Sequence, residues 1–224
     1  MHPTALDNGS LFFECYLATR PGATVIEIGS QDVNGSLRPL APPGCRYTGL
    51  DFAAGPGVDQ VLDDPYRLPL EAGSVDAVVS SSCFEHIEFF WLMFNEVLRV
   101  LKPDGLFYLN APSNGEFHRY PVDCWRFYPD AGTALVNWAR RSGYKPVLLE
   151  SFTTPQRLDI WNDFVSVYLK DESCLGAHPQ RMLDRLTHFS NGRRHGADGL
   201  LNPQRETEDL ATLRQLRGSA KPLA

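Results

Sequence analysis

The sequence predicts an open α/β fold, in which helices cover both faces of a mostly parallel sheet. Three observations lead to this prediction. Short apolar segments with strand character alternate along the chain with helices or long connections. The strand expected over 75–80 is apolar on both sides, as in a sheet that is covered on both faces. The strand expected over 106–111 follows a helix at once and is apolar enough to be central.

The first half of the chain is expected to contain one helix and four strands. Apolar residues at helical spacing, ended by a Pro-Gly pair, predict a helix over 10–19. β-branched residues predict a strand over 24–28, and the segment after a Pro-Pro-Gly turn predicts another over 46–51. A short third strand over 58–62 precedes the apolar strand over 75–80.

The second half continues the alternation. Most apolar side chains of segment 87–101 fall on one helical face and its polar side chains fall on the other, so this segment is the best-defined helix. A Lys-Pro-Asp-Gly sequence ends it before the strand over 106–111. A helix over 130–142 and two closing strands, over 145–152 and 164–169, complete the pattern.

Composition argues against several classes of protein. With 224 residues, 43% of them hydrophobic, the chain is long enough for one domain with a sizeable core. No apolar stretch reaches the length of a membrane span, so we expect a cytoplasmic protein that does not enter a membrane. The net charge of -6 and the lack of a dense Lys/Arg stripe argue against general nucleic-acid binding and favour a small-molecule substrate. Five scattered cysteines indicate neither a disulfide framework nor a zinc site.

Polar side chains follow the ends of several predicted strands. Ligands of open α/β folds bind at the carboxyl ends of the parallel strands, so these residues form a candidate cofactor site. Gly29 allows the backbone to turn sharply beside a ligand. Asp51 lies about twenty residues farther on, the spacing at which a carboxylate accepts the two hydroxyl groups of an adenosine ribose. The candidate cofactor-binding residues are Glu27, Gly29, Ser30, Gln31, Asp51, Phe52, Asp63, Asp64, Ser80 and Ser81.

The loop after the first strand distinguishes between two cofactors that contain this ribose. A dinucleotide requires a loop of the form G-x-G-x-x-G against its pyrophosphate. Loop 29–35 lacks the second and third glycines of that pattern, and Asp32 would repel a phosphate. S-adenosylmethionine carries a sulfonium and an ammonium group, which acidic side chains at Glu27 and Asp32 would attract. The loop therefore favours S-adenosylmethionine over NAD.

Four segments occur in a distinctive order along the chain: VIEIGS, YTGLD, DDPYRLPLEAGSVDAVVSSSCFEHI and EVLRVLKPDGLFYLNAPS. In combination they resemble the successive motifs of class I S-adenosylmethionine-dependent methyltransferases, in particular the broad methyltransferase type 11-like group, over about residues 20–150. The resemblance implies a Rossmann-like three-layer sandwich. It implies a seven-stranded, mostly parallel sheet with an antiparallel last strand, here over 164–169. The first loop departs from the family because it lacks the usual G-x-G.

The same resemblance implies roles for individual residues. The loop after the first strand would surround the methionine part of S-adenosylmethionine, and Asp51 would bind its ribose. Asp63 and Asp64 are adjacent and point in different directions, so we expect only one to face the ligand; the resemblance favours Asp64, near the adenine amino group. Ser80 or Ser81 would lie beside the cofactor. Glu27 could equally bind the ligand or order the loop that follows it.

A long segment rich in aromatic and charged residues, 115–130, is the candidate acceptor site, because long loops at the ligand-binding edge of a sheet are often functional. His118 could take a proton from an acceptor hydroxyl group, with Asp123 as its orienting partner. His86 is the second candidate base. Alternatively, Asp123 pairs with Arg126 to fix the loop, and His118 caps a turn. No pattern of ligand residues in the sequence requires a metal.

These features predict a methyltransferase domain over 1–170 that acts on a small-molecule acceptor, such as one containing a sugar. Transfer to oxygen is favoured over transfer to nitrogen. Two alternatives stay open: an NAD-type oxidoreductase on the same scaffold, and a non-catalytic protein that binds S-adenosylmethionine. Residues 171–224 form a polar extension, with weak helical patterns over 180–189 and 207–216, that could cover the active site, join a homodimer or be partly disordered.

Overall fold

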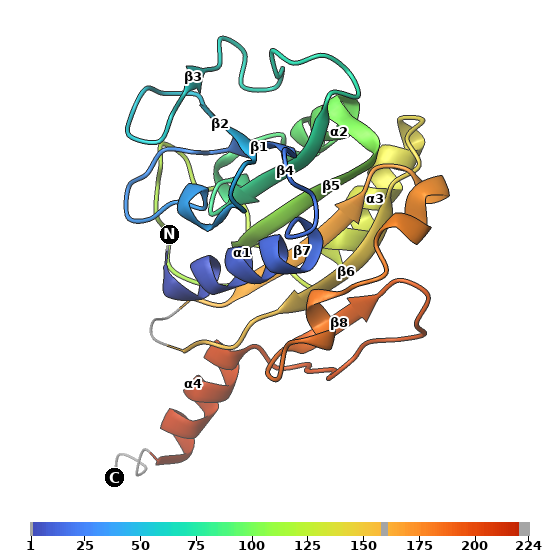
Figure 1. The fold of residues 1–224 in the computed structure, drawn as a ribbon. Coiled ribbons are helices and arrows are strands. Elements are labelled where there is room, and N and C mark those ends of the chain that lie inside the picture. Colours follow the sequence, from blue (N-terminus) through green and yellow to red (C-terminus); the bar gives the residue numbers. More distant parts are fainter. Residues whose placement is uncertain (1, 158–160, 220–224) are drawn as a thin grey trace.

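The computed structural model describes residues 2–157 and 161–219, which form a three-layer α/β structure (Figure 1). An eight-stranded sheet with the order β3-β2-β1-β4-β5-β7-β6-β8 is the middle layer. Helix α1 (Pro3–Tyr16) covers one face of the sheet, and α2 (Phe90–Val100) and α3 (Ala131–Arg141) cover the other. The predicted α/β fold with both faces covered is therefore confirmed.

The strands reproduce most of the predicted order. Their bounds are β1 (Thr24–Ile28), β2 (Arg46–Asp51), β3 (Gln60–Val61), β4 (Val75–Ser81), β5 (Leu101–Pro112), β6 (Val147–Thr153), β7 (Asp163–Leu169) and β8 (Ser190–Arg194). Strands β1 to β5 pair in parallel. β7 runs antiparallel to both β5 and β6, which confirms the predicted antiparallel strand.

The predicted count of seven strands is corrected by β8, which pairs antiparallel with β6 at the edge of the sheet. Its sequence, Ser-Asn-Gly-Arg-Arg, contains no β-branched or aromatic residue and so carries no strand signal. The predicted helix over 180–189 is also wrong, since this segment contains only the short 3₁₀ helix η4 (Met182–Asp184). Three further 3₁₀ helices are η1 (Arg38–Leu40), η2 (Phe84–His86) and η3 (Glu172–Ala177).

The helices differ from the predictions mainly at their ends. α1 begins at Pro3 instead of residue 10, because a proline in the first turn suits a helix start and the added turns bury Ala5 and Asn8. α2 begins at Phe90 instead of residue 87, and the short η2 precedes it. α4 (Glu208–Ser219) agrees with the second weak helical pattern and projects from the body of the molecule (Figure 1).

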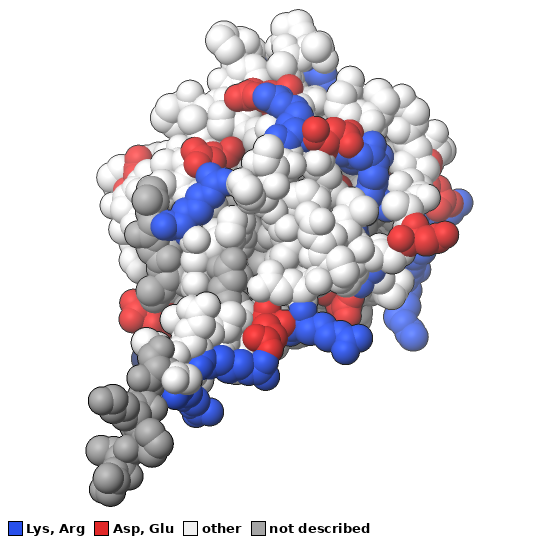
Figure 2. Space-filling view, turned by 90° about the horizontal axis from the view of Figure 1, so that it is seen from below, with Lys and Arg blue, Asp and Glu red and all other residues white. Residues whose placement is uncertain are grey.

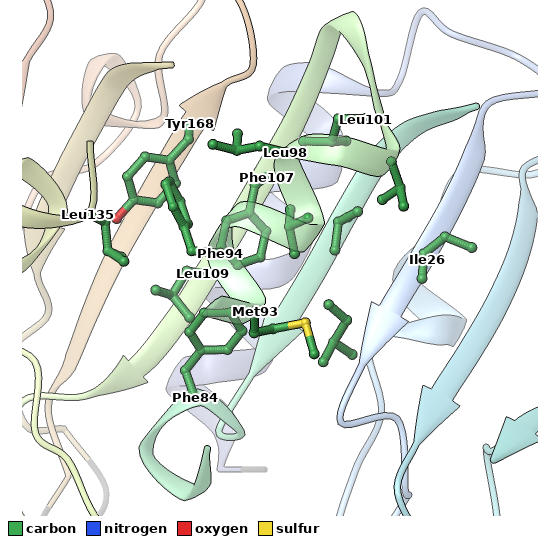
Figure 3. Close-up of a cluster of buried hydrophobic side chains, with 14 of the residues drawn as sticks. Ile26, Phe84, Met93, Phe94, Leu98, Leu101, Phe107, Leu109, Leu135 and Tyr168 are labelled. Atoms are coloured by element: carbon green, nitrogen blue, oxygen red, sulfur yellow. The ribbon is translucent and has the colours of Figure 1, made fainter. Parts of the chain in front are cut away.

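Two apolar cores lie on opposite faces of the sheet. On one face, Phe94 of α2 contacts Phe107 of β5 and Tyr168 of β7, with ring centroids 5.9 and 4.9 Å from that of Phe94 (Figure 3). On the other face, Phe12 of α1 packs on Tyr108 with a centroid distance of 4.7 Å. Because neighbouring residues of β5 point to opposite faces, this one strand anchors both cores.

A buried carboxylate attaches the segment after β7 to the rest of the domain. Glu150 of β6 accepts a hydrogen bond from the Tyr16 hydroxyl group at 2.5 Å. It also accepts hydrogen bonds from the backbone amides of Met182 and Leu183, at 2.8 and 2.9 Å. Residues just before β8 are thereby held against α1 and β6, although the polar composition of this part of the chain suggested a separate extension.

The surface carries charges of both signs. On the face shown in Figure 2, Lys and Arg side chains are interspersed with Asp and Glu side chains around a largely uncharged centre. This face offers no broad basic area of the kind that binds nucleic-acid backbones. Within residues 2–157 and 161–219, no helix is both long enough and apolar enough to cross a lipid bilayer.

Candidate active site

A cavity of about 630 Å³ lies at the carboxyl ends of β1, β2 and β4. Its lining comes from the loops after β1 and β2, from η2 and from the segment that contains residues 116 and 118–122. The predicted site residues that line the cavity are Glu27, Gly29, Ser30, Gln31, Asp51, Phe52, Ser81, His86 and His118. The remaining predicted residues, Asp63, Asp64, Ser80 and Asp123, do not line it.

Gly29 forms the sharp turn after β1. Its φ of 75° is a left-handed conformation that strains other residues, and a Cβ atom at this position would lie 2.4 Å from the Cβ of Cys83. The Gly29 amide donates a hydrogen bond to the carbonyl oxygen of Leu50 at 3.0 Å. A glycine here therefore allows the loops after β1 and β4 to meet at the floor of the cavity.

Asp51 holds its carboxylate in a fixed position at the end of β2. The Gln31 amide donates to Oδ2 at 3.0 Å, and the Ala53 amide donates to Oδ1 at 3.3 Å. Each carboxylate oxygen has a second lone pair, so both can still accept a hydrogen bond from a ligand. Phe52, half exposed beside it, adds an aromatic ring to the cavity wall.

Glu27 is buried within β1 and also lines the cavity. Burial raises the pKa of Glu27 to about 7, and the hydrogen bond from the Tyr47 hydroxyl group, 2.9 Å from Oε2, only partly opposes this effect. The Glu27 carboxyl group therefore connects β1 to β2 beside the cavity.

The predicted residues outside the cavity have local structural partners. Asp63 and Asp64 are exposed, and Asp64 caps a turn by accepting the Tyr66 amide at 2.8 Å. Tyr66 lines the cavity in their place. Ser80 is completely buried and donates its hydroxyl to the carbonyl oxygen of Ile28 at 3.0 Å, which joins β4 to β1.

Two histidines that line the cavity lie against each other. The rings of His86 and His118 have centroids 4.9 Å apart and are nearly perpendicular. His86 Nδ1 lies 2.5 Å from the carbonyl oxygen of Val122, and His118 Nδ1 lies 3.2 Å from that of Glu116. A carbonyl oxygen only accepts hydrogen bonds, so Nδ1 of His86 is its protonated nitrogen and Nε2 is left as an acceptor. Nδ1 of His118 also lies 3.5 Å from Nη2 of Arg126, which only donates. Burial lowers the pKa of His86, which favours the neutral form of this ring.

Glu85 is the third member of this group. The sequence had indicated only its neighbour, His86, as a candidate site residue. Its Oε1 lies 3.7 Å from His86 Nε2, and its side chain is 1% exposed. Burial raises the pKa of Glu85 to about 8. One ligand atom from each of Glu85, His86 and His118 lies within 4.8 Å of the others, the one such group of three among the residues that the structure describes. The Glu-His pair in the sequence was the available signal for Glu85.

Asp123 and Arg126 form the ion pair that their spacing allows. Arg126 donates to both carboxylate oxygens, at 2.6 and 2.9 Å, and its proximity lowers the pKa of Asp123 to about 2. Asp123 also accepts the backbone amide of His118 at 2.7 Å, whereas His118 Nδ1 lies 3.5 Å away. The carboxylate therefore fixes the backbone of the loop and adds negative charge beside the imidazole.

Comparison with known proteins agrees with this architecture. A sequence profile described as a methyltransferase domain matches residues 27–109. An uncharacterized methyltransferase of Mycobacterium leprae is 32% identical over 113 residues, which are 46% of this chain and 42% of that protein. One of Mycobacterium ulcerans is 29% identical over 161 residues, 62% of this chain and 60% of that protein. The chain thus spans about half the length of the curated relatives it matches.

Solved structures share the fold at low sequence identity. A Burkholderia thailandensis 1,6-didemethyltoxoflavin-N1-methyltransferase, solved with its substrate and S-adenosylhomocysteine, has a TM-score of 0.57 and 18% identity over 75% of this chain and 79% of that one. The Bacillus YcgJ protein has a TM-score of 0.54 and 14% identity over 76% of this chain and 100% of that one. Residues 27–109 are thus similar to a methyltransferase domain, and the chain shares the fold of these solved structures.

Proposed function

We propose that this chain transfers a methyl group from S-adenosylmethionine to a small molecule bound in the cavity, and that the acceptor atom is oxygen in preference to nitrogen. The observation that carries this proposal is the continuity of the cavity. Gly29 and Asp51 line one part of it, and His86 and His118 line another. A cofactor at the first end and an acceptor at the second would share one cavity.

The residues at the ends of β1 and β2 fit S-adenosylmethionine. The fixed carboxylate of Asp51 would accept hydrogen bonds from the two ribose hydroxyl groups, and the backbone at Gly29 would allow close approach of the amino-acid part. Glu27 would attract the positive groups of the cofactor once its proton is lost. When bound, this cofactor supplies a methyl group already activated on a sulfonium.

The work left to the protein is to orient the acceptor and to exclude water. Residues 116–122 bring Glu116, His118 and Tyr120 over the cavity. An oxygen acceptor must also lose a proton, and the Nε2 atoms of His118 and His86 are the candidate proton acceptors, because each Nδ1 faces a carbonyl oxygen. The oxygen preference follows from the presence of these two candidate proton acceptors, since an amine would need only a free electron pair.

Calorimetric titration with S-adenosylhomocysteine tests the cofactor site. We expect the wild-type chain to bind it, and we expect Asp51→Asn to weaken binding by about 10- to 100-fold, the loss expected for hydrogen bonds to a charged group. Asp198→Asn, an exposed carboxylate beyond β8, is the matched control and should leave the affinity unchanged. Equal affinities for wild type and Asp51→Asn would refute the assignment. Binding of NAD(H) in place of S-adenosylhomocysteine would support the oxidoreductase.

Transfer itself is tested with methyl-labelled S-adenosylmethionine and a panel of hydroxyl-containing small molecules, including sugars, beside a matched panel of amines. We expect label in a hydroxyl compound, and we expect Asp51→Asn to reduce that transfer. Label found only in the amine panel would contradict the oxygen preference. Cofactor binding without transfer to any member of either panel, or to a cell extract, would favour the non-catalytic alternative.

A further inference from the structure

The acceptor end of the cavity contains a compact group of metal-binding side chains. Glu85 and His86 belong to η2, whereas His118 comes from the loop after β5. One ligand atom from each lies within 4.8 Å of the other two. Two imidazole nitrogens and one carboxylate oxygen are the donor set of many catalytic transition-metal sites, which keep further coordination positions open for a substrate.

A second observation points independently to a cation. Glu85 lines the cavity with a side chain that is 1% exposed, and its Oε2 has no hydrogen-bond partner among the described residues. Asp163 lines the same cavity and is equally buried; its Oδ1 lies 3.2 Å from Nε2 of His2, and its Oδ2 lacks a partner among them. A buried carboxylate oxygen without a partner is costly unless a bound group satisfies it, and two such oxygens beside one cavity call for positive charge.

The surroundings also prepare the histidines as ligands. Nδ1 of His86 faces the carbonyl oxygen of Val122, and Nδ1 of His118 faces that of Glu116, with Asp123 at 3.5 Å. Contacts of this kind fix the tautomer and ring orientation of metal-binding histidines and leave Nε2 to bind the ion. The His118 side chain is 36% exposed, so a small rotation of its ring can shorten the spacing of the ligand atoms to the roughly 3.4 Å of a tetrahedral site.

We propose that Glu85, His86 and His118 bind a divalent transition-metal ion at the acceptor end of the cavity. Two nitrogen ligands favour ions such as Zn²⁺ or Fe²⁺ over Mg²⁺ or Ca²⁺, which prefer oxygen. The role of the ion rests on the proposed function: an acceptor oxygen in an open coordination position would lose its proton to solvent water more readily. When the ion is bound, Nε2 of both histidines is occupied as a ligand, so solvent water takes the proton that the metal-free chain would pass to a histidine.

Metal binding is measured on the chain alone, without a polyhistidine tag, after treatment with EDTA and dialysis. Titration with Co²⁺ is followed by visible absorption, and Zn²⁺ is then added to displace it. We expect one ion per chain with the absorption of nitrogen-ligated Co²⁺. Glu85→Gln and His118→Ala should each weaken binding by more than about tenfold, the smallest loss usual even for an outer partner of a ligand. His195→Ala, an exposed histidine at the end of β8, is the matched control and should bind as the wild type does.

The result that overturns the proposal is a wild-type chain that binds neither Co²⁺ nor Zn²⁺ at large molar excess, or one whose binding is unchanged in both variants. If Glu85→Gln fails to fold by circular dichroism, His118→Ala carries the test, because its side chain is partly exposed. The titration involves no methyl transfer. A chain that binds the ion but not S-adenosylhomocysteine would refute the proposed function alone, and the opposite result would refute the metal site alone.

Discussion

The hydroxyl group of Tyr120 donates a hydrogen bond to Oε1 of Gln31 across 3.1 Å. Both residues line the cavity, Gln31 from the loop after β1 and Tyr120 from the segment after β5. The contact therefore joins the proposed cofactor end of the cavity to the proposed acceptor end. It holds the two loops together over the ligand space.

Removing this hydrogen bond should loosen the two loops. We expect Tyr120→Phe to weaken S-adenosylhomocysteine binding by about two- to tenfold, the effect of one neutral hydrogen bond. Calorimetry measures the affinity, and stopped-flow fluorescence should show that the faster step is release of the ligand. Tyr128→Phe, an exposed tyrosine farther along the same segment, is the control. An unchanged dissociation rate in Tyr120→Phe would show that the contact does not hold the ligand.

Glu27 should make the stability of the protein depend on pH. Burial raises its pKa from 4.5 to about 7, so the folded chain holds the proton more tightly than the unfolded chain does. The free energy of unfolding therefore falls as the pH rises through this interval. Between about pH 5 and about pH 8, we expect the free energy of unfolding to fall by about 2–3 kcal/mol less in Glu27→Gln than in the wild type. Urea unfolding at both pH values measures it.

Glu71→Gln is the matched control for this measurement, because Glu71 is exposed on the surface. Its unfolding free energy should follow that of the wild type at both pH values. If Glu27→Gln shows the same pH dependence as the wild type, Glu27 is ionised at little cost in the folded chain, and its carboxyl group is better solvated than its burial indicates.

Glu150 should be among the most important polar residues for stability. Glu150→Ala removes the acceptor for the Tyr16 hydroxyl and for the amides of Met182 and Leu183, and leaves these donors unpaired in the interior. We expect a loss of about 3 kcal/mol or more in the free energy of unfolding, measured by urea denaturation. Glu172→Ala, at an exposed position of η3, should change it by less than about 0.5 kcal/mol. A similar small loss in Glu150→Ala would mean that water replaces the carboxylate.

Apolar patterning was sufficient to predict most of the fold. The bounds of β1 and β2 agree with the predicted strands because their β-branched and apolar residues stand between clear turn signals. β8 could not be predicted, because its polar residues become a strand only by pairing with β6, about forty residues earlier in the sequence. Burial of Met182 and Leu183 likewise depends on Glu150, a partner that local patterns do not reveal.

The sequence predicted the site residues whose positions depend on the local sequence. It missed a site residue whose position depends on contacts with a distant segment. Glu27, Gly29 and Asp51 lie at strand ends, and strand order brings such positions together at one edge of a parallel sheet. Asp64 turns away because a capped turn holds it outside the cavity. Glu85 was missed because its burial depends on the distant segment after β5, whose Cys124 amide donates to the Glu85 carbonyl oxygen at 2.8 Å.

Both edge strands of the eight-stranded sheet are poor partners for a further strand. One border is β3, which has only two residues, and the other is β8, whose Gly192 exchanges backbone hydrogen bonds with Leu201. Arg193 and Arg194 place charges along β8 and pair with Asp130 and Asp184. Short, covered or charged edges prevent strands of different molecules from joining into a continuous sheet. Within the part of the chain described here, two copies would therefore associate through side-chain surfaces and not by pairing their edge strands. Concentrated solutions of the folded protein should accordingly not form fibrils through these edges.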